Sequence, residues 1–134
     1  MGCDKESVKD QNQREIEAYL ESNNLEAEST ASGLHYIITN TGSGSHPSVN
    51  NTVFVYYKGY FLNGDTFDAR LRPADPISFS LGSVILGWQE GIPLLKRGGK
   101  ATLLIPSHLA YGSTPRSGIP ANSVLLFDVE LVNY

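Results

Sequence analysis

The residues that could bind a metal or attack a substrate are scattered along this chain. His35, His46 and His108 stand far apart, and none lies at metal-ligand spacing from another histidine or from Cys3. No Gly-x-Ser-x-Gly turn is present to expose a nucleophilic serine. The glycine-rich stretch 96–100 follows an expected helix and precedes an expected strand, whereas a phosphate-binding loop opens a helix. The sequence therefore predicts no metal, no cofactor and no covalent catalysis.

Asp65 and Asp68 are the nearest approach to a pair of acid–base carboxylates. They lie beside the predicted hairpin turn at Asn63-Gly64, a dipeptide typical of a type I′ turn in which both residues have positive φ. An exposed hairpin needs polar residues of its own, so we favour hairpin polarity over acid–base catalysis as the reason for this pair.

Aromatic residues are frequent between residues 56 and 127. They are Tyr56, Tyr57, Tyr60, Phe61, Phe67, Phe79, Trp88, Tyr111 and Phe127. Trp88 lies between Gly87 and Gly91 on a helix short enough to leave its ring as the floor of a pocket. Tyr111 stands at the mouth of a long loop, where its hydroxyl can face a ligand. The alternative is an aromatic core, but these two placements favour an apolar binding pocket.

The length and composition of the chain fit one globular domain with a short extension. The chain has 134 residues, of which 40% are hydrophobic and 18% charged. Its net charge of -4 argues against a nucleic-acid partner, because phosphate backbones attract basic surfaces. The single cysteine excludes an internal disulfide. No apolar run approaches the roughly 18 residues that a membrane-spanning helix needs.

Hydrophobic patterning places these residues on a few elements. Period-two alternation and β-branched runs predict strands over residues 34–39, 52–61, 66–68, 77–81, 101–105 and 124–132. A short helix is expected within residues 82–95, and a long loop over residues 107–122. The expected fold class is α+β, with an antiparallel sheet covering one short helix.

Residues 1–33 are polar and differ from the rest of the chain. Within them Ile16, Tyr19 and Leu20 recur at helical spacing and predict a short amphipathic helix over residues 11–24, ended by a pair of asparagines. This helix could dock on the domain, pair with a second copy in a dimer, or act as a spacer from a membrane anchor. The sequence leaves these three alternatives open.

Cys3 has two interpretations. Preceded by Gly2, it resembles the first residue of a mature bacterial lipoprotein, which places the chain in the periplasm or cell envelope with a lipid anchor. Otherwise it is an incidental exposed thiol, and the cytoplasm is the second choice of location. N-myristoylation is excluded, because its motif needs Ser or Thr where this chain has Glu6.

Several motifs, in matching order and spacing, resemble the FK506-binding proteins. They are Val55-Tyr56-Tyr57-Lys58-Gly59 with Asn63-Gly64-Asp65-Thr66-Phe67-Asp68, then Phe79-Ser80-Leu81-Gly82 with Val84-Ile85-Leu86-Gly87-Trp88-Gln89-Glu90-Gly91, then Ile105-Pro106-Ser107-His108-Leu109-Ala110-Tyr111-Gly112, and Leu126-Phe127-Asp128-Val129-Glu130-Leu131. The resemblance covers residues 34–134. Residues 1–33 lie outside it and resemble only the leaders of bacterial membrane-anchored members.

The resemblance implies a half-barrel of antiparallel sheet wrapped around one short helix, with the active site between them. It implies a domain over residues 34–134 that accelerates cis–trans rotation of Xaa-Pro bonds in folding proteins, without a cofactor, and an extension over residues 1–33. The expected partners are proline-containing polypeptides and ligands of the FK506 and rapamycin type.

The resemblance also implies which residues form the site. The catalytic set is Tyr57, Phe67, Asp68, Ile85, Trp88, Tyr111 and Phe127, and further substrate-binding residues are Val84, Ile119 and Ile77. Trp88 would be the floor under the proline ring, and Phe67 and Phe127 the walls. The Ile85 N–H and the Tyr111 hydroxyl would donate to substrate carbonyls.

The chain departs from the family pattern in three places. Ile77 stands where the family has an aromatic residue, so the wall of the pocket at this position is narrower. Pro73 occupies the position of an arginine that orients the first-hairpin tyrosine in some members, with Arg70 or Arg72 as substitutes. The segment between Gly82 and Val84 is two residues shorter than in the best-known member of the family, which makes the rim of the pocket tighter there. These three changes bear on macrolide affinity and peptide preference.

Two rival functions remain. A catalytically weak chaperone or protein-binding module could share this fold and pocket. A small β-rich carrier of an apolar ligand would need a closed barrel of about eight strands, more than the sequence predicts. Turnover of a proline peptide separates the isomerase from both.

Overall fold

The computed structural model describes residues 7–134, and Cys3 therefore lies outside the described residues. The first element is helix α1, Val8–Ser22. It begins three residues earlier than predicted because Ser7 caps it, its side chain accepting a 3.1 Å hydrogen bond from the Asp10 N–H. The asparagine stop is confirmed, since Asn24 has a φ of 53° just beyond the helix end.

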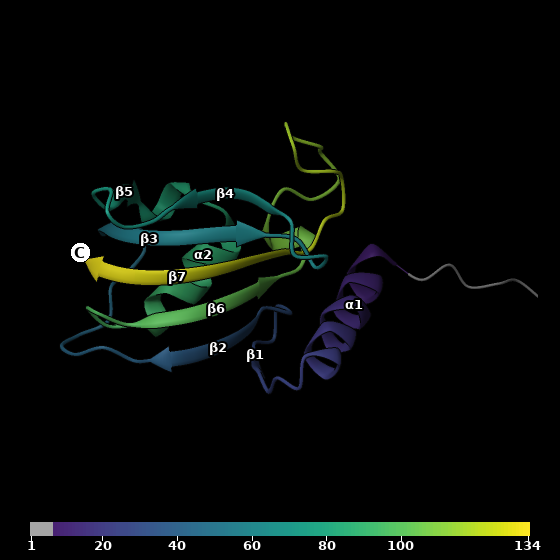
Figure 1. Ribbon diagram of the computed structural model, residues 1–134, viewed down its shortest axis with the longest axis horizontal. Coiled ribbons are helices and arrows are strands. Elements are labelled where there is room, and N and C mark those ends of the chain that lie inside the picture. Colours follow the sequence, from purple (N-terminus) through teal and green to yellow (C-terminus); the bar gives the residue numbers. More distant parts are fainter. Residues whose placement is uncertain (1–6) are drawn as a thin grey trace, which may run out of the picture.

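Seven strands of the described chain form one antiparallel sheet. They are β1 (Glu28–Ser29), β2 (His35–Asn40), β3 (Thr52–Tyr60), β4 (Thr66–Arg70), β5 (Ile77–Ser80), β6 (Lys100–Ile105) and β7 (Leu125–Asn133). Their order is β1-β2-β6-β7-β3-β4, and β5 also pairs with β3 (Figure 1). The predicted α+β class and the open sheet around one short helix are confirmed.

One edge of β3 pairs with β7, and its other edge pairs with two short strands, β4 and β5. The first half of β3 pairs with β5, where Val53 lies opposite Phe79. Its second half pairs with β4, where Gly59 lies opposite Asp68. Both short strands therefore extend the sheet at this edge, and each contributes side chains to the same face.

The turn between β3 and β4 differs from the predicted type I′ turn. The Gly64 N–H donates to the Phe61 carbonyl and the Phe61 N–H to the Asp65 carbonyl, both at 2.9 Å. Gly64 has a φ of 93°, whereas Asn63 is not among the residues with positive φ. This is a type I turn followed by a glycine bulge, which the register shift at Gly59 and Tyr60 accommodates.

Helix α2 (Leu86–Gly91) packs on one face of the sheet between two short 3-10 turns, Leu81–Ser83 and Ile92–Leu94. Glycine allows its close approach to β6. A Cβ built on Gly87 would lie 2.6 Å from the Ile105 side chain. The helix therefore sits closer to the strand than any larger residue at this position would permit.

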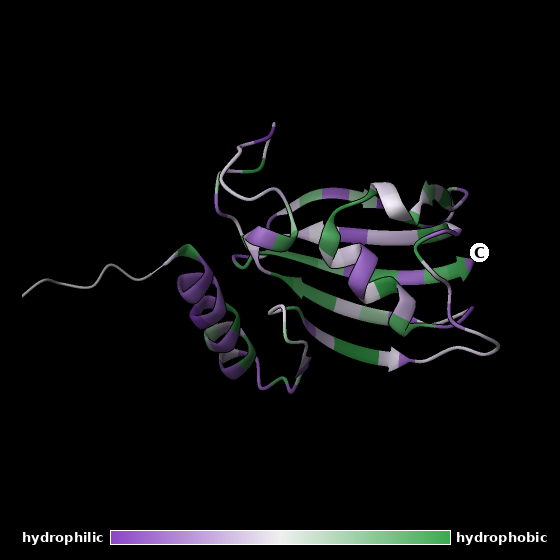
Figure 2. Cartoon of the chain, turned by 180° about the vertical axis from the view of Figure 1, so that it is seen from behind, coloured by the Kyte–Doolittle hydropathy of each residue, from purple (hydrophilic) through white to green (hydrophobic). Residues whose placement is uncertain are grey.

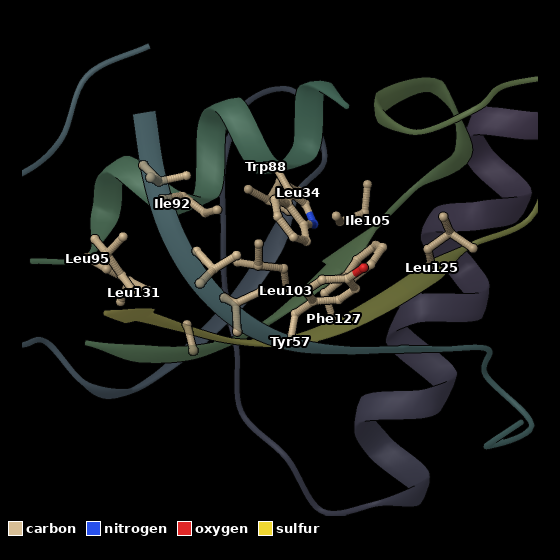
Figure 3. Packing of buried hydrophobic residues seen from close by; sticks show 14 of the residues in the cluster. Leu34, Tyr57, Trp88, Ile92, Leu95, Leu103, Ile105, Leu125, Phe127 and Leu131 are labelled. Carbon is tan, nitrogen blue, oxygen red and sulfur yellow. The ribbon is translucent and has the colours of Figure 1, made fainter. Parts of the chain in front are cut away.

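The main core lies between α2 and the sheet. Alternate residues of β3, β6 and β7 point into it, including the fully buried Val53, Leu103 and Leu131. Figure 3 shows these layers, with Ile92 and Leu95 reaching down from the helical segment. Viewed from behind, α2 crosses the sheet with apolar segments of the strands beneath it (Figure 2).

Helix α1 docks on the end of the sheet rather than standing free (Figure 1). Ile16 is fully buried and Leu20 nearly so, in a second cluster with Leu104, Val124 and Leu126. Of the three alternatives for this helix, docking on the domain is the one that its apolar stripe adopts. Among residues 7–134, neither α-helix has the length and hydropathy needed to span a membrane.

Candidate functional site

A cavity of about 440 Å³ opens between α2 and the sheet, where β4, β5 and the loop after β6 meet. Its lining residues are Tyr57, Phe67, Asp68, Ile77, Phe79, Ser83, Val84, Ile85, Trp88, Tyr111, Arg116 and Phe127. All the predicted catalytic residues are among them, as are Val84 and Ile77. Most of this lining is apolar or aromatic, so the cavity offers a hydrophobic surface with a few polar groups at its rim.

The Trp88 indole is the centre of an aromatic cluster. Tyr57, Phe79 and Phe127 each meet it edge-on, with ring centroids 5.3, 5.5 and 5.3 Å away and interplanar angles of 78°, 90° and 87°. Figure 3 shows Trp88 on α2 with the Tyr57 and Phe127 rings beneath it. Each such contact contributes about 0.5–1.5 kcal/mol beyond area burial, so the three rings together hold the indole in this position.

A second aromatic contact forms a wall. Phe67 meets Phe127 edge-on, with ring centroids 5.6 Å apart, and the two rings flank Gly59 on β3. A Cβ on Gly59 would lie 2.7 Å from the Phe67 ring and 2.8 Å from the Phe127 ring. The absence of a side chain at this position therefore allows the two rings to come together.

Tyr57 and Asp68 form the polar contact inside this apolar site. The Tyr57 hydroxyl donates a 2.7 Å hydrogen bond to a carboxylate oxygen of Asp68. Burial raises the pKa of Tyr57 well above its ordinary value, and the hydrogen bond to the charged Asp68 raises it further. The hydroxyl is therefore a protonated donor committed to Asp68.

The rim before α2 presents a backbone donor. Ile85 is the N-cap of α2. The N–H groups at the start of a helix have no acceptor within the helix, so the Ile85 N–H can donate to a ligand. Gln89 holds this rim in place, because its side-chain amide donates to the Val84 carbonyl at 2.8 Å and to the Gly82 carbonyl at 3.2 Å. Tyr111 faces the same cavity from the opposite loop.

Three lining residues were not predicted. Phe79 could have been found, since it lies two residues after Ile77 on the same strand and so on the same face. Ser83 belongs to the short turn before the rim. Arg116 lies in the irregular loop, its guanidinium 4.6 Å from the centroid of the Tyr111 ring. No local pattern marks a loop residue whose position depends on tertiary contacts.

Ile119 and the two arginines occupy different surroundings from those expected. Ile119 is 8% exposed and packs in the main core beneath the loop, outside the set of lining residues. Arg70 donates to the Asp75 carbonyl at 2.7 Å. Arg72 stacks on Tyr56, 4.3 Å from its ring centroid, and forms an ion pair with Glu130 at 2.7 Å. Arg72 therefore orients Tyr56, a different tyrosine from the one in the pocket.

A larger hollow, of about 540 Å³, lies on the outer face of the sheet. Its polar residues alternate in charge across neighbouring strands, as where Lys58 lies opposite Asp128 and Lys100 opposite Glu130. Cross-strand pairs of this kind are typical of a solvated sheet face. Within residues 7–134, no three side chains of the metal-binding types gather closely enough to hold an ion.

Comparison with known families identifies the family to which this chain belongs. The profile of the family described as FKBP-type peptidyl-prolyl cis-trans isomerase matches residues 43–132. The chain belongs to this family. The aromatic cavity lies within the matched residues, whereas α1, β1 and β2 precede them.

Individual FKBP-type relatives agree with this assignment. The protein named FKBP-type peptidyl-prolyl cis-trans isomerase FkpA from Buchnera aphidicola (subspecies Schizaphis graminum) is 48% identical over 105 residues, 78% of this chain and 42% of the relative. Its counterpart from Aeromonas hydrophila is 41% identical over 132 residues, 97% of this chain and 48% of the relative. The chain thus spans less than half the length of these curated relatives.

Solved FKBP-type structures have the same arrangement. The crystal structure of FkpA from Escherichia coli matches with a TM-score of 0.82 and 41% identity, over 92% of this chain and 59% of that one. A peptidyl-prolyl cis-trans isomerase from Pseudomonas syringae pv. tomato matches with a TM-score of 0.78 and 27% identity, over 98% of both chains. The latter match includes the region of the N-terminal helix.

Proposed function

We propose that this chain is a peptidyl-prolyl cis–trans isomerase, acting on proline-containing polypeptides. The observation that carries the proposal is the aromatic cavity, in which three rings meet the Trp88 indole edge-on. Its volume of about 440 Å³ suits a proline ring with its neighbouring residues. Membership of the FKBP-type family supports the same activity.

The reaction suits a site of this composition, because no covalent bond is broken. Rotation about a peptide bond must cross a barrier of about 18–20 kcal/mol that comes from amide resonance. In the twisted transition state the resonance is lost and the carbonyl is less polar. An apolar cavity therefore disfavours the planar amide more than the twisted one, which is differential binding of the transition state.

The polar groups at the rim would hold the peptide while the bond rotates. We assign the Ile85 N–H and the Tyr111 hydroxyl as donors to substrate carbonyls, Trp88 as the floor, and Phe67 and Phe127 as walls. Support comes from their common position around one cavity. We assign Tyr57 and Asp68 a supporting role, in which they hold one side of the cavity in place, because the Tyr57 hydroxyl already donates to the Asp68 carboxylate.

NMR exchange spectroscopy on short Ala-Xaa-Pro-Phe peptides tests the activity directly. Catalytic amounts of the wild-type chain should accelerate cis–trans exchange, and both Trp88→Ala and Tyr111→Phe should reduce that acceleration. If a folded wild-type chain binds the peptide without accelerating exchange, the isomerase proposal fails. A catalytically weak chaperone or protein-binding module is then the better assignment.

For the extent and location of the functional unit we keep two further proposals. The first is that residues 34–134 form the isomerase domain and residues 1–33 an extension. The second is that the chain acts in the bacterial periplasm or cell envelope, anchored through a lipid on Cys3. Mass spectrometry of the protein from its native host decides the second, since an unmodified Cys3 rejects the anchor.

A further inference from the structure

One buried side chain of α1 contacts both ends of the loop that carries Tyr111. Asn12 is 1% exposed. Its Oδ1 accepts hydrogen bonds from the Ser107 N–H at 2.9 Å and from the Ser107 hydroxyl at 2.5 Å. Its Nδ2 donates to the Asn122 carbonyl at 3.3 Å and to a Glu15 carboxylate oxygen at 3.2 Å. The side chain is thus fully engaged in an environment closed to water.

Ser107 and Asn122 are the two ends of loop 107–122. The loop contains one 3-10 turn, Ser107–Leu109, and one isolated bridge between Arg116 and Ile119, and its residues 113–118 are exposed. The ends are also tied to the middle of the loop. The Gly112 N–H donates to the Ser107 carbonyl and the Asn122 N–H donates to the Gly112 carbonyl, both at 2.8 Å. Gly112, to which both ends of the loop are hydrogen-bonded, directly follows Tyr111, whose side chain lines the cavity.

We propose that Asn12 is a positioning residue for the isomerase site. By bonding both ends of loop 107–122, it holds Tyr111 and the stacked Arg116 against the cavity. This rests on the proposed function, and it makes α1, which lies outside the matched family region, part of the working site. Asn12 itself does not line the cavity and acts through Tyr111.

The docking of α1 does not depend on this side chain, which makes the proposal testable. Ile16 and Leu20 bury the helix against Leu104, Val124 and Leu126 independently of Asn12. An Asn12→Ala variant should therefore keep the helix in place, while leaving the Ser107 N–H and hydroxyl without their acceptor and the Asn122 carbonyl without this donor. The bonds of both ends to Gly112 remain, but nothing then ties the ends to α1, so the loop samples open conformations more often.

The experiment compares Asn12→Ala with Gln13→Ala in the full chain. Gln13 is the matched control, since it lies next to Asn12 on α1 but its side chain contacts His35 at 3.2 Å rather than the loop. Peptide exchange kinetics give KM and kcat, and amide hydrogen exchange reports the opening of residues 108–121. Ser107→Ala removes one of the two donors to Asn12 and should have a smaller effect than Asn12→Ala.

We expect Asn12→Ala to raise KM by about three- to tenfold while kcat changes by less than about twofold, because a bound peptide restores the closed loop and only the competent fraction binds. Hydrogen exchange should accelerate within the loop alone, and Gln13→Ala should change neither measurement. Equal losses in both variants with faster exchange throughout the chain, or an unchanged KM and loop in Asn12→Ala, would overturn the proposal.

Failure of the proposed function is distinguishable from failure of this inference. If the wild-type chain accelerates no peptide, the isomerase assignment fails on that measurement alone. The loop-exchange arm still reports whether Asn12 holds the loop. Unchanged loop exchange in Asn12→Ala rejects the positioning role, whatever the activity.

Discussion

The Tyr57 hydroxyl donates to Asp68 across the wall of the aromatic cavity, at 2.7 Å. Replacing Tyr57 by Phe leaves the Asp68 carboxylate without this donor. Because the Asp68 side chain is exposed and water can replace the lost donor, we expect the free energy of unfolding to fall by only about 0.5–1.5 kcal/mol at neutral pH, the usual net contribution of one hydrogen bond. Urea unfolding of the two proteins measures this, and a variant as stable as wild type would contradict the role assigned to the pair.

The same contact predicts how alkali affects stability. Burial, and then Asp68, raise the pKa of Tyr57 above its ordinary value near 10. The unfolded chain therefore loses its Tyr57 proton first, and this contribution to stability is complete below about pH 10 and declines at higher pH. Wild type should lose stability more steeply above pH 10 than Tyr57→Phe, as measured by urea unfolding across that range. Parallel curves would show that Tyr57 ionises equally in both states.

Gly59→Ala tests the contact between the two wall rings. The added Cβ would approach both Phe67 and Phe127 to less than 3 Å, so the rings must shift. We expect a loss of about 1–3 kcal/mol in unfolding free energy, together with a lower kcat/KM, as is usual for overpacking. Gly44→Ala is the control, because a Cβ there has no neighbour within 4 Å and only its positive φ of 96° is strained. Equal activity in both variants would contradict the importance of the wall.

Trp88→Phe tests the unpaired indole nitrogen. Trp88 is 4% exposed, and its Nε1 is buried with no hydrogen-bond partner among the described residues. Phenylalanine leaves a smaller ring but removes the unsatisfied donor, and these effects oppose each other. We expect the unfolding free energy to stay within about 1 kcal/mol of wild type, whereas Trp88→Ala should lose about 3–5 kcal/mol. Thermal or urea unfolding of both variants provides the comparison.

Ile16→Ala tests whether α1 folds together with the domain. Ile16 is fully buried in the cluster with Leu104 and Leu126, so truncation should cost about 2–4 kcal/mol of unfolding free energy in a single transition. Val8, 40% exposed on the same helix, provides the control, and Val8→Ala should change stability by less than about 0.5 kcal/mol. A domain of unaltered stability in Ile16→Ala would mean that α1 folds independently.

Much of the fold was predictable because its signals are local. Period-two alternation in residues such as Ile77 and Phe79 identified strands, and the glycines around Trp88 marked the short helix. The start of α1 was missed because capping by Ser7 extends a helix beyond its apolar stripe. The Asn63-Gly64 turn type was wrong because the register shift at Gly59 and Tyr60 places one more residue in the hairpin.

The site was predictable where the family motifs extend, and not beyond them. Trp88 and Phe127 stand at motif positions, and the structure brings them together. Arg116 lies in a loop without periodicity, where its backbone bonds to Ile119 and the stacking of its guanidinium on Tyr111 fix its position. The bonds of Asn12 to the loop join residues 95 and 110 positions apart, a separation at which a single sequence offers no signal.

Strand β1 is only two residues long, yet it pairs with Tyr36 and His35 at the outer edge of β2. An uncovered sheet edge presents unpaired N–H and C=O groups that any extended chain can join. The short strand occupies part of that edge, and the acidic Glu26 and Glu28 line the hollow beside it. By occupying part of this edge, β1 leaves fewer backbone groups to which another extended chain, including a second copy of this one, could add as a strand.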